Sequence, residues 1–413
     1  MYCSHLSLAN FRNYSRLELD LSPGVTIVQG DNAQGKTNLL EAIFFLATTR
    51  SPRTTVDREL IHWLSLSEQL PFARIAGTVH RSSGDLRVDI SLMLRDQREM
   101  DANNGSIGTA QPMVKRIRVN NIPRRAVELI GQVNVVTFSP EDIDLVAGSP
   151  SQRRRYLDMT IAQIDRVYLR ELQRYNRVLA QRNHLLRLIR EQRAHVDQLP
   201  FWNDQLADAG SYLVAQRQRV VCRLNELIRD IHPRLTGRAE HLQIAYLSTV
   251  CPQPCTAGAG HLVEASDSAY LRDSFGKELS RMLEKEIAQG VSLLGPHRDD
   301  LQFVVDRADL NIYGSRGQQR TASLATKLAE AQLMRAETGE QPILLLDDVL
   351  SELDAKRRQH LLESVDAGQQ VLATSTDLDH FTSAFLGRAT ILQVEQGCIF
   401  AADTAVFKGA GQT

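Results

Sequence analysis

The spacing of hydrophobic residues changes twice along the chain, and each change marks a different kind of secondary structure. In the first and last parts of the chain, apolar and polar residues alternate or form short apolar runs, which predicts strands. The predicted strands lie in 1–30, 72–94, 117–126, 133–140, 301–305, 342–348, 370–376 and 391–397. Helical spacing predicts helices between these strands over 36–48, 321–338 and 354–365.

The middle of the chain has a helical period. From Arg155 to Arg193 there is no Gly or Pro, and apolar residues recur at steps of three, four or seven, which predicts one long helix. A second helix is predicted over 201–231, after Pro200, and a third over 270–288, with a short strand over 242–247. Two long helices joined by a short loop indicate an antiparallel arm.

These elements predict an α/β fold in which one domain is interrupted by another. Residues 1–150 and 291–413 are expected to form the discontinuous α/β domain, and 151–290 a mostly helical insertion. The polar stretches 95–113 and 251–268 are expected to be loops.

Composition excludes several classes of protein. The 413 residues are 43% hydrophobic and 23% charged, which is typical of globular chains and not of disordered ones. No apolar run is long enough to span a membrane, and the first residues do not form a secretory signal. Five scattered cysteines favour a reducing compartment, so we expect a cytoplasmic protein. Cys251 and Cys255 make one CxxxC pair, which indicates two free thiols rather than a zinc site needing four ligands.

The strongest motif is a complete G-x-x-x-x-G-K-T that follows a predicted buried strand and opens a helix. Glycines let backbone N–H groups face phosphate oxygens at the positive end of the helix dipole, which is the chemistry of a P-loop. Lys36 is expected to reach the β- and γ-phosphates of ATP, and Thr37 to bind Mg²⁺. The expected ATP-binding residues are Gly30, Asp31, Asn32, Ala33, Gln34, Gly35, Lys36, Thr37 and Asn38.

The second motif is the apolar run 343–346 followed by two acids. A buried strand that ends in carboxylates has the Walker B form, in which Asp347 holds Mg²⁺ and Asp348 acts on the attacking water. Apolar runs that end in acids are common, so the pairing with a P-loop is what makes this motif specific.

A third motif, Tyr313-Gly-Ser-Arg-Gly-Gln-Gln-Arg320, precedes a predicted helix. It is a Gly-rich turn with a helix cap, and it also resembles the signature motif of ABC-type ATPases. On that resemblance Ser315, Gly317 and Gln318 contact the γ-phosphate from a second subunit, with Ser315 as a donor. The run after Walker B, with Ser351 and Asp354, resembles the D-loop of the same ATPases.

Taken together, the motifs resemble the RecF family of bacterial recombination-mediator ATPases, within the SMC-like branch. The resemblance rests on segments along nearly the whole chain, which are 8–14, 30–42, 138–142, 148–155, 295–300 and 346–354. It implies an ABC/SMC-like ATPase head with a helical arm. It also implies an ATP-dependent homodimer on double-stranded DNA, including single-strand/double-strand junctions, with slow, DNA-stimulated ATP hydrolysis. The implied partners are RecR, RecO and RecA.

The sequence departs from common ABC patterns in four places, one of which is that no Gln follows the strand over 133–140 to begin a Q-loop, since Gln132 precedes that strand. Asp348 stands where many of these ATPases have Glu, and the strand over 370–376 ends without a switch histidine, since His380 lies four residues further on. Arg316 stands where the family more often has Gln. These differences argue against fast turnover but not against ATP binding.

Charge adds a candidate DNA surface. The net charge is −1, yet residues 151–200 hold eleven Arg and five acids, and 114–126 holds five cations and no acid. Such clusters are either solvated faces or contacts to phosphate, with no motif for base readout. The candidate DNA contacts are Lys115, Arg116, Arg118, Arg124, Arg125, Arg153, Arg154 and Arg155.

Other functions remain as alternatives. A transporter ATPase subunit or another SMC-like repair ATPase would share the P-loop and Walker B motifs, but the Arg-rich arm argues against the transporter. His297-Arg298-Asp299-Asp300 is either a metal site or a structural turn.

Overall fold

The computed structural model describes residues 1–67, 70–94, 113–237, 240–251, 267–365 and 368–401. The chain forms two compact units, Met1–Pro140 with Met334–Thr413, and Glu141–Leu333. The division therefore falls at 140 and 334, whereas the sequence pattern divided the chain at 150 and 290.

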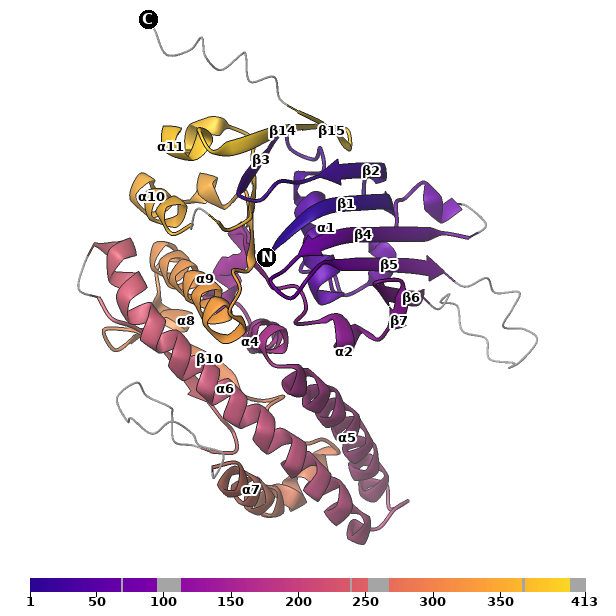
Figure 1. The fold of residues 1–413 in the computed structure, drawn as a ribbon. Coiled ribbons are helices and arrows are strands. Elements are labelled where there is room, and N and C mark those ends of the chain that lie inside the picture. The colour runs from indigo at the N-terminus through magenta and orange to yellow at the C-terminus, as the bar shows by residue number, and fades with distance from the viewer. Residues whose placement is uncertain (68–69, 95–112, 238–239, 252–266, 366–367, 402–413) are drawn as a thin grey trace, which may run out of the picture. The chain divides into compact units, whose positions relative to one another are not determined.

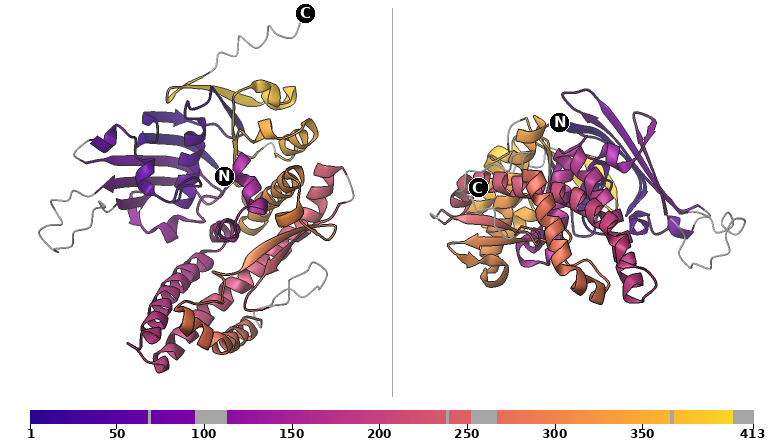
Figure 2. Two further views of the ribbon diagram at one scale, coloured as in Figure 1. Left: turned by 180° about the vertical axis from the view of Figure 1, so that it is seen from behind. Right: turned by 90° about the horizontal axis from the view of Figure 1, so that it is seen from below.

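The first unit contains an antiparallel sheet in the order β2-β1-β4-β5-β6-β7 (Figure 1; Figure 2, left). Its strands are β1 (Tyr2–Phe11), β2 (Tyr14–Asp20), β4 (Phe72–His80), β5 (Leu86–Leu94), β6 (Met113–Val119) and β7 (Ile122–Arg124). Alternate residues of β5, from Leu86 to Leu94, are buried, and the residues between them lie on the opposite, open face of the sheet. The alternation of the sequence thus corresponds to one covered face and one accessible face.

A second, mostly parallel sheet of this unit has the order β15-β14-β3-β13-β12-β8. Its strands are β3 (Val25–Gln29), β8 (Val135–Phe138), β12 (Ile343–Asp347), β13 (Val371–Ser375), β14 (Ala389–Glu395) and β15 (Cys398–Ala401). Helix α1 (Lys36–Thr48) contacts strands of both sheets and is buried on nearly every side, which explains why all residues of 39–47 except Glu41 are apolar. Shorter helices α2 (Ala126–Leu129), α10 (Ala355–Glu363) and α11 (Ser383–Leu386) complete the unit.

The second unit is mostly helical. It contains α3 (Asp144–Ala147), α4 (Pro150–Ile164), α5 (Arg166–Arg190), α6 (Leu199–Thr236), α7 (Asp267–Gln289), α8 (Leu310–Tyr313) and most of α9 (Arg316–Thr338). A three-stranded sheet in the order β11 (Ala308–Asp309), β10 (Asp300–Val305) and β9 (Leu242–Leu247) joins them. Helices α5, α6 and α7 pack on one another as the predicted arm (Figure 1). Among the helices that the structure describes, none is both long and apolar enough to cross a membrane.

The single long helix predicted over 155–193 is wrong in one respect, because it consists of α4 and α5. The break lies at Asp165, whose backbone is extended and whose carboxylate accepts hydrogen bonds from the amides of Val167 (2.8 Å) and Tyr168 (3.2 Å). An Asp that caps a new helix can end the preceding one without Gly or Pro. The apolar period alone did not reveal this break.

Candidate functional site

The P-loop of the sequence lies between β3 and α1, at the carboxyl edge of the parallel sheet. Lys36, the first residue of α1, is buried, and its ammonium donates to the carbonyls of Gly30 (2.5 Å) and Asp31 (2.9 Å). Burial lowers the pKa of Lys36, while the carboxylates of Asp348, Asp31 and Asp347 act in the opposite direction. The Lys36 ammonium therefore contacts the backbone at the start of the loop, whose residues surround a phosphate in a P-loop.

Two glycines of the loop are required by close contacts. Gly35 has φ 113°, and a Cβ there would lie 2.5 Å from the side-chain nitrogen of Asn13. A Cβ at Gly30 would lie 2.5 Å from the carbonyl oxygen of Val394. Any side chain at either position would displace the loop from its supports.

Those supports include residues that the motif did not identify. The Asn13 amide donates to the Gln34 carbonyl at 2.9 Å and accepts from Asn38 at 2.8 Å. The backbone amide of Gln396, in the turn between β14 and β15, donates to the Gln34 side chain at 2.6 Å. Asn13 lies in one of the segments that carry the family resemblance, so its position in the sequence was a signal, although its role was not.

The two Walker B acids lie at the end of β12, beside the P-loop. Oδ1 of Asp347 accepts hydrogen bonds from the hydroxyls of Thr37 (2.8 Å) and Thr374 (2.9 Å). The structure thus brings the predicted magnesium ligands Thr37 and Asp347 into contact. A hydroxyl and a carboxylate are hard oxygen donors of the kind that Mg²⁺ takes alongside phosphate oxygens, so these residues fit that ion.

Asp348 follows with a left-handed backbone, φ 49°. Its amide donates to the Thr374 hydroxyl at 3.0 Å, and its buried Oδ1 has no hydrogen-bond partner. A buried carboxylate oxygen without a donor is costly in a finished core. The unpaired Oδ1 of Asp348 suits an acid whose hydrogen-bond donor comes from a bound ligand or water.

The predicted D-loop continues from these acids. The hydroxyl of Ser351 donates to the Asp348 carbonyl at 2.7 Å, and both Ser351 and Glu352 are exposed. Asp354 caps α10 by accepting from the amide of Arg357 at 2.9 Å. The exposed turn is therefore fixed at both ends.

The signature residues lie in the second unit, at the start of α9. Ser315 and Gln318 form a reciprocal cap, because the Ser315 hydroxyl accepts from the Gln318 amide (3.3 Å) and the Gln318 side chain accepts from the Ser315 amide (3.0 Å). Ser315, Gly317 and Gln318 are all exposed, and a Cβ at Gly317 would meet nothing within 4 Å. Ile312 and Tyr313, just before them, are 70% and 78% exposed. The helix end is thus open to a ligand or to a second protein surface.

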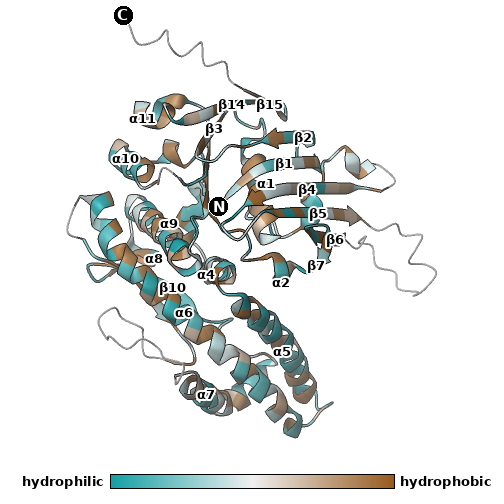
Figure 3. Ribbon diagram, viewed as in Figure 1, coloured by the Kyte–Doolittle hydropathy of each residue, from teal (hydrophilic) through white to brown (hydrophobic). Residues whose placement is uncertain are grey.

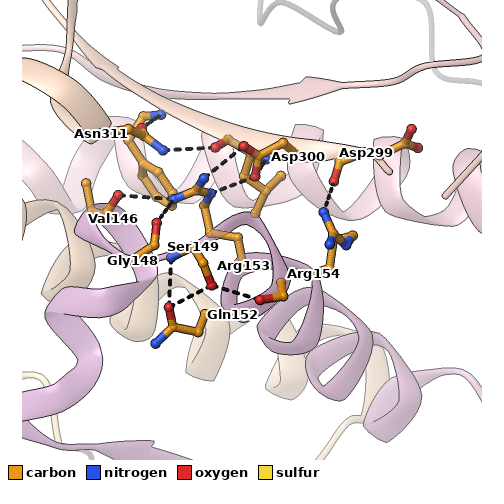
Figure 4. A network of polar contacts seen from close by, with 12 residues as sticks. Val146, Gly148, Ser149, Gln152, Arg153, Arg154, Asp299, Asp300 and Asn311 are labelled. Atoms are coloured by element: carbon orange, nitrogen blue, oxygen red, sulfur yellow. Dashed lines mark hydrogen bonds and ion pairs between the residues drawn. The ribbon is translucent and has the colours of Figure 1, made fainter. Parts of the chain in front are cut away.

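The burial and pairing of Arg153 argue against its predicted role as a DNA contact (Figure 4). This side chain is 4% exposed, and its guanidinium forms a bidentate pair with Asp300 at 2.7 and 2.8 Å and also donates to the Gly148 carbonyl. Neighbouring Arg154 donates to the Asp299 carbonyl at 2.8 Å (Figure 4). The cluster joins α4 to β10, and Arg153 has no donor face open to solvent.

The other predicted cations lie on or beside β6. Lys115 faces the covered side of the sheet, where it pairs with Asp57 at 2.8 Å and lies over the Phe45 ring. Arg116, Arg118, Arg124 and Arg125 are exposed. Strand alternation therefore separates Lys115 from Arg116 and Arg118, whereas Arg124 and Arg125 are exposed at β7 and at the start of α2.

The strand register adds two arginines that sequence reasoning missed. Ala9 of β1 lies between Arg16 of β2 and Arg74 of β4. Ser91 of β5 lies in the same way between Arg74 and Arg116 of β6. Arg16, Arg74 and Arg116 therefore form one lateral row on the open face, on alternate strands about 10 Å apart. Arg74 also pairs with Asp89 at 2.6 Å. No sequence signal joins these residues, because the row exists only once five strands are in register.

The turn with His297, Asp299 and Asp300 is fully engaged within the second unit. Oδ1 of Asp299 accepts from the amide and hydroxyl of Thr249, both at 2.8 Å, while Asp300 holds Arg153. Tyr175 donates to Nδ1 of His297 at 2.7 Å, and Nε2 of the ring lies 3.2 Å from the Ser292 carbonyl. Burial lowers the pKa of His297 to about 4.

Within the described residues, no three or more His, Cys, Asp or Glu side chains gather as a metal site. Cys255 lies outside the described residues.

Comparison with known proteins agrees with this geometry. The family model described as RecF/RecN/SMC N terminal domain matches residues 2–399. A solved structure of an SMC head bound to the C-terminal winged-helix domain of ScpA is 14% identical, with a TM-score of 0.51 over 98% of this chain and 99% of that one. At that identity the likeness concerns the fold alone. The fold is that of an ABC/SMC-like P-loop ATPase head with a helical arm.

More similar proteins define the family. The DNA replication and repair protein RecF of Chloroflexus aurantiacus is 47% identical over 97% of this chain and 100% of its own length. The protein of that name from Halalkalibacterium halodurans is 40% identical over 97% of this chain and 99% of its own. A structure described as the recombination mediator protein RecF with ATP in the RecFOR pathway has a TM-score of 0.81 and 30% identity over 97% of this chain and 98% of that one. The chain belongs to the RecF family of DNA replication and repair proteins.

Proposed function

We propose that this protein is an ATP-controlled clamp on duplex DNA, which binds ATP with Mg²⁺, dimerises, and hydrolyses ATP slowly. The observation that carries the proposal is the contact of Thr37 with Asp347 beneath a loop closed on Lys36. That arrangement suits a nucleoside triphosphate and its cation, and the structure of a relative described as RecF-ATP supports it.

Each residue of the pocket has a physical role in this proposal. Lys36 supplies positive charge to the terminal phosphates, and the amides of 30–37 donate to phosphate oxygens. Mg²⁺, when bound with ATP, neutralises charge on the β- and γ-phosphates. Thr37 and Asp347 would hold it. Asp348, whose Oδ1 lacks a donor, would orient the attacking water or accept its proton.

The second half of each ATP site comes from another copy of the chain. The exposed cap of α9, with Ser315, Gly317 and Gln318, offers a hydroxyl and the positive end of a helix of 23 residues. The exposed Ile312 and Tyr313 beside it suit burial against a second protein surface. The homodimer would therefore form only while ATP joins the two halves.

For DNA, the proposed surface of the first unit is the open face of the antiparallel sheet. Arg116, Arg118 and the lateral row with Arg16 and Arg74 offer charge at a spacing suited to phosphates, without groups arranged to read bases. Arg124 pairs across from Ile117, so it lies on the other face of the sheet at the strand β7, and Arg125 precedes α2. Both are exposed and stay further candidates beside this surface. Arg154 and Arg155 of α4 stay further candidates, and single-strand/double-strand junctions are a further expected substrate.

The partners follow from the family. Relatives described as recombination mediators of the RecFOR pathway support an interaction with RecR, and with RecO and RecA in the step that loads RecA at single-strand gaps. We propose that the protein acts there as a nucleotide switch in the cytoplasm.

The test is to measure mass in solution with ATP, with ADP and without nucleotide, each with and without duplex DNA. A dimer that forms only with ATP, and an ATPase rate that duplex DNA raises, are the expected results. A monomer under every condition, or a rate indifferent to DNA, would contradict the clamp.

A further inference from the structure

The solvent face of α5 carries one row of basic side chains. Arg166, Arg170, Arg177, His184 and Arg187 are all exposed, and at 3.6 residues per turn they fall within about 120° of the helix circumference. We call these five residues the arginine stripe. The opposite side of α5 carries the buried apolar residues, among them Tyr175, Leu186 and Ile189, and Figure 3 shows that much of the α5 ribbon is coloured as hydrophilic.

The charge of the stripe is not balanced by its own helix. Glu171 is the only acid between 166 and 190, and it lies 3.3 Å from Arg174 and 3.5 Å from Arg170. In the part of the chain that the structure describes, Arg166, Arg177 and Arg187 form no ion pair. Like charges three or four positions apart destabilise a helix by tenths of a kcal/mol each. Within the stripe this applies to Arg166 and Arg170, whereas Arg187, in the last turn, interacts favourably with the helix dipole.

Other arginines of the same segment have a different purpose. Arg182 is 0% exposed and pairs with Glu286 at 2.6 Å, and Arg174 pairs with Asp208 at 2.8 Å. These side chains hold α5 against its neighbours in the arm. The arginines of α5 thus fall into two groups, those in ion pairs between helices of the arm and those of the exposed stripe.

We propose that the arginine stripe binds the phosphate backbone of duplex DNA. The inference rests on the proposed function and adds a second contact surface, on the helical unit. From Arg166 to Arg187 the stripe is about 31 Å long, which is the length of roughly nine nucleotides of one strand. Four guanidinium groups at this spacing offer bidentate donors to phosphate oxygens.

The composition of the stripe distinguishes DNA from a protein partner. The exposed positions that lie along or beside the stripe are Gln173, Asn176, Ala180 and Gln181, none of them aromatic or a large aliphatic residue. Val167 is 40% exposed but lies about 100° around the helix from Arg166, outside the stripe. Protein interfaces have an apolar, often aromatic core, whereas protein–DNA interfaces are polar and positively charged. An acidic protein surface is therefore the less suitable occupant.

The experiment replaces the four arginines of the stripe in the full chain: Arg166→Gln, Arg170→Gln, Arg177→Gln and Arg187→Gln. The matched control, Arg223→Gln, Arg229→Gln, Arg234→Gln and Arg281→Gln, removes the same charge from α6 and α7 of the same unit. Binding to duplex DNA is measured with ATP over a series of salt concentrations. The slope of log K against log salt should fall by about 0.9 per lost contact, so by roughly 3 to 4, and the control should keep the wild-type slope. At about 0.15 M salt the stripe variant should bind at least tenfold more weakly.

A third variant has Lys at the same four positions. It should retain the wild-type slope, because the slope depends on the number of phosphates that positive charges neutralise, and it shows that the helix tolerates replacement. A Gln variant with the slope of the control would overturn the inference while leaving the proposed function intact. A wild-type protein that does not bind duplex DNA would instead overturn the proposed function. Loss of binding to single strands alone would also contradict the stripe as a duplex surface.

Discussion

Thr374 donates its hydroxyl hydrogen to Oδ1 of Asp347 at 2.9 Å, so a residue of β13 fixes the acid at the end of β12. The same hydroxyl oxygen accepts from the amide of Asp348 at 3.0 Å. One buried threonine therefore sets both the carboxylate that faces Thr37 and the backbone of the second acid.

Removal of this hydroxyl should impair chemistry more than nucleotide binding. Thr374→Val keeps the shape of the side chain but removes one of the two hydroxyls that donate to Oδ1 of Asp347, and residues that orient metal ligands typically contribute 10- to 100-fold. We expect kcat for ATP to fall by about that factor, with KM for ATP within roughly threefold of wild type. The variant should also gain less affinity for ATP when Mg²⁺ is added, measured by equilibrium binding. Thr374→Ser should restore both properties, and equal losses in Thr374→Ser and Thr374→Val would contradict the role.

The period of apolar residues predicted most helices and strands, because it shows which face of each element is buried. The P-loop and Walker B were also predictable from local sequence. The P-loop is a strand, a loop and a helix that follow one another in the chain, and Walker B is an apolar strand that ends in two acids. Thr374 was not predictable, since its role depends on β12 and β13 being parallel neighbours in register. Arg153 and Arg116 look alike in the sequence, and only tertiary structure shows that one is buried against Asp300 and the other exposed. The break at Asp165 was missed because a polar cap does not disturb the apolar period.

Lys36 and Asp348 should affect different steps. Lys36→Ala removes a charge-assisted contact worth about 1.5–3 kcal/mol, so ATP should bind roughly 10- to 100-fold more weakly. Asp348→Asn has nearly the same shape without the charge, and it should bind ATP normally but hydrolyse it at least about 100-fold more slowly. Equilibrium binding of ATP and steady-state hydrolysis measure the two effects. A wild-type hydrolysis rate in Asp348→Asn would exclude its role toward water.

Arg153 should matter for stability and not for DNA. Arg153→Met leaves Asp300 without its bidentate partner in a largely buried site, and breaking a buried pair costs about 3–5 kcal/mol. The urea unfolding transition should move to lower urea, and the double variant with Asp300→Leu should recover part of the loss. The salt slope for DNA binding of the folded protein should not change. A smaller slope of log K against log salt, with unchanged stability, would show that Arg153 contacts DNA.

His297 should make the second unit sensitive to acid. The unfolded chain protonates this side chain below its usual pKa of about 6.5, whereas the folded protein resists protonation until about pH 4. The free energy of unfolding should therefore fall as pH decreases between these values, by up to roughly 1.4 kcal/mol per pH unit. His297→Gln can still accept from Tyr175 and donate to Ser292, and it should show a flatter dependence. Urea unfolding at several pH values measures both proteins, and parallel curves would contradict the assignment.

Ser315 should act on the ATP bound by the other subunit. Ser315→Arg places a bulky charge on the open end of α9 and should prevent closure, while Lys36 and Thr37 of the same chain stay intact. The variant should bind ATP as a monomer, fail to dimerise and hydrolyse almost nothing. Ser315→Asn is the control, because Asn also caps helices and adds no charge.

Mixing Ser315→Arg with Lys36→Ala tests the assignment between subunits. In a mixed dimer, one composite site joins the intact P-loop of the Ser315→Arg chain to the intact signature of the Lys36→Ala chain, and the other site carries both defects. Partial recovery of ATP hydrolysis on mixing, relative to each variant alone, is the expected result. The decisive measurement is on the single variant, because mass in solution and hydrolysis report closure directly. If Ser315→Arg dimerises with ATP and hydrolyses it at the wild-type rate, the signature does not complete a site on a second subunit.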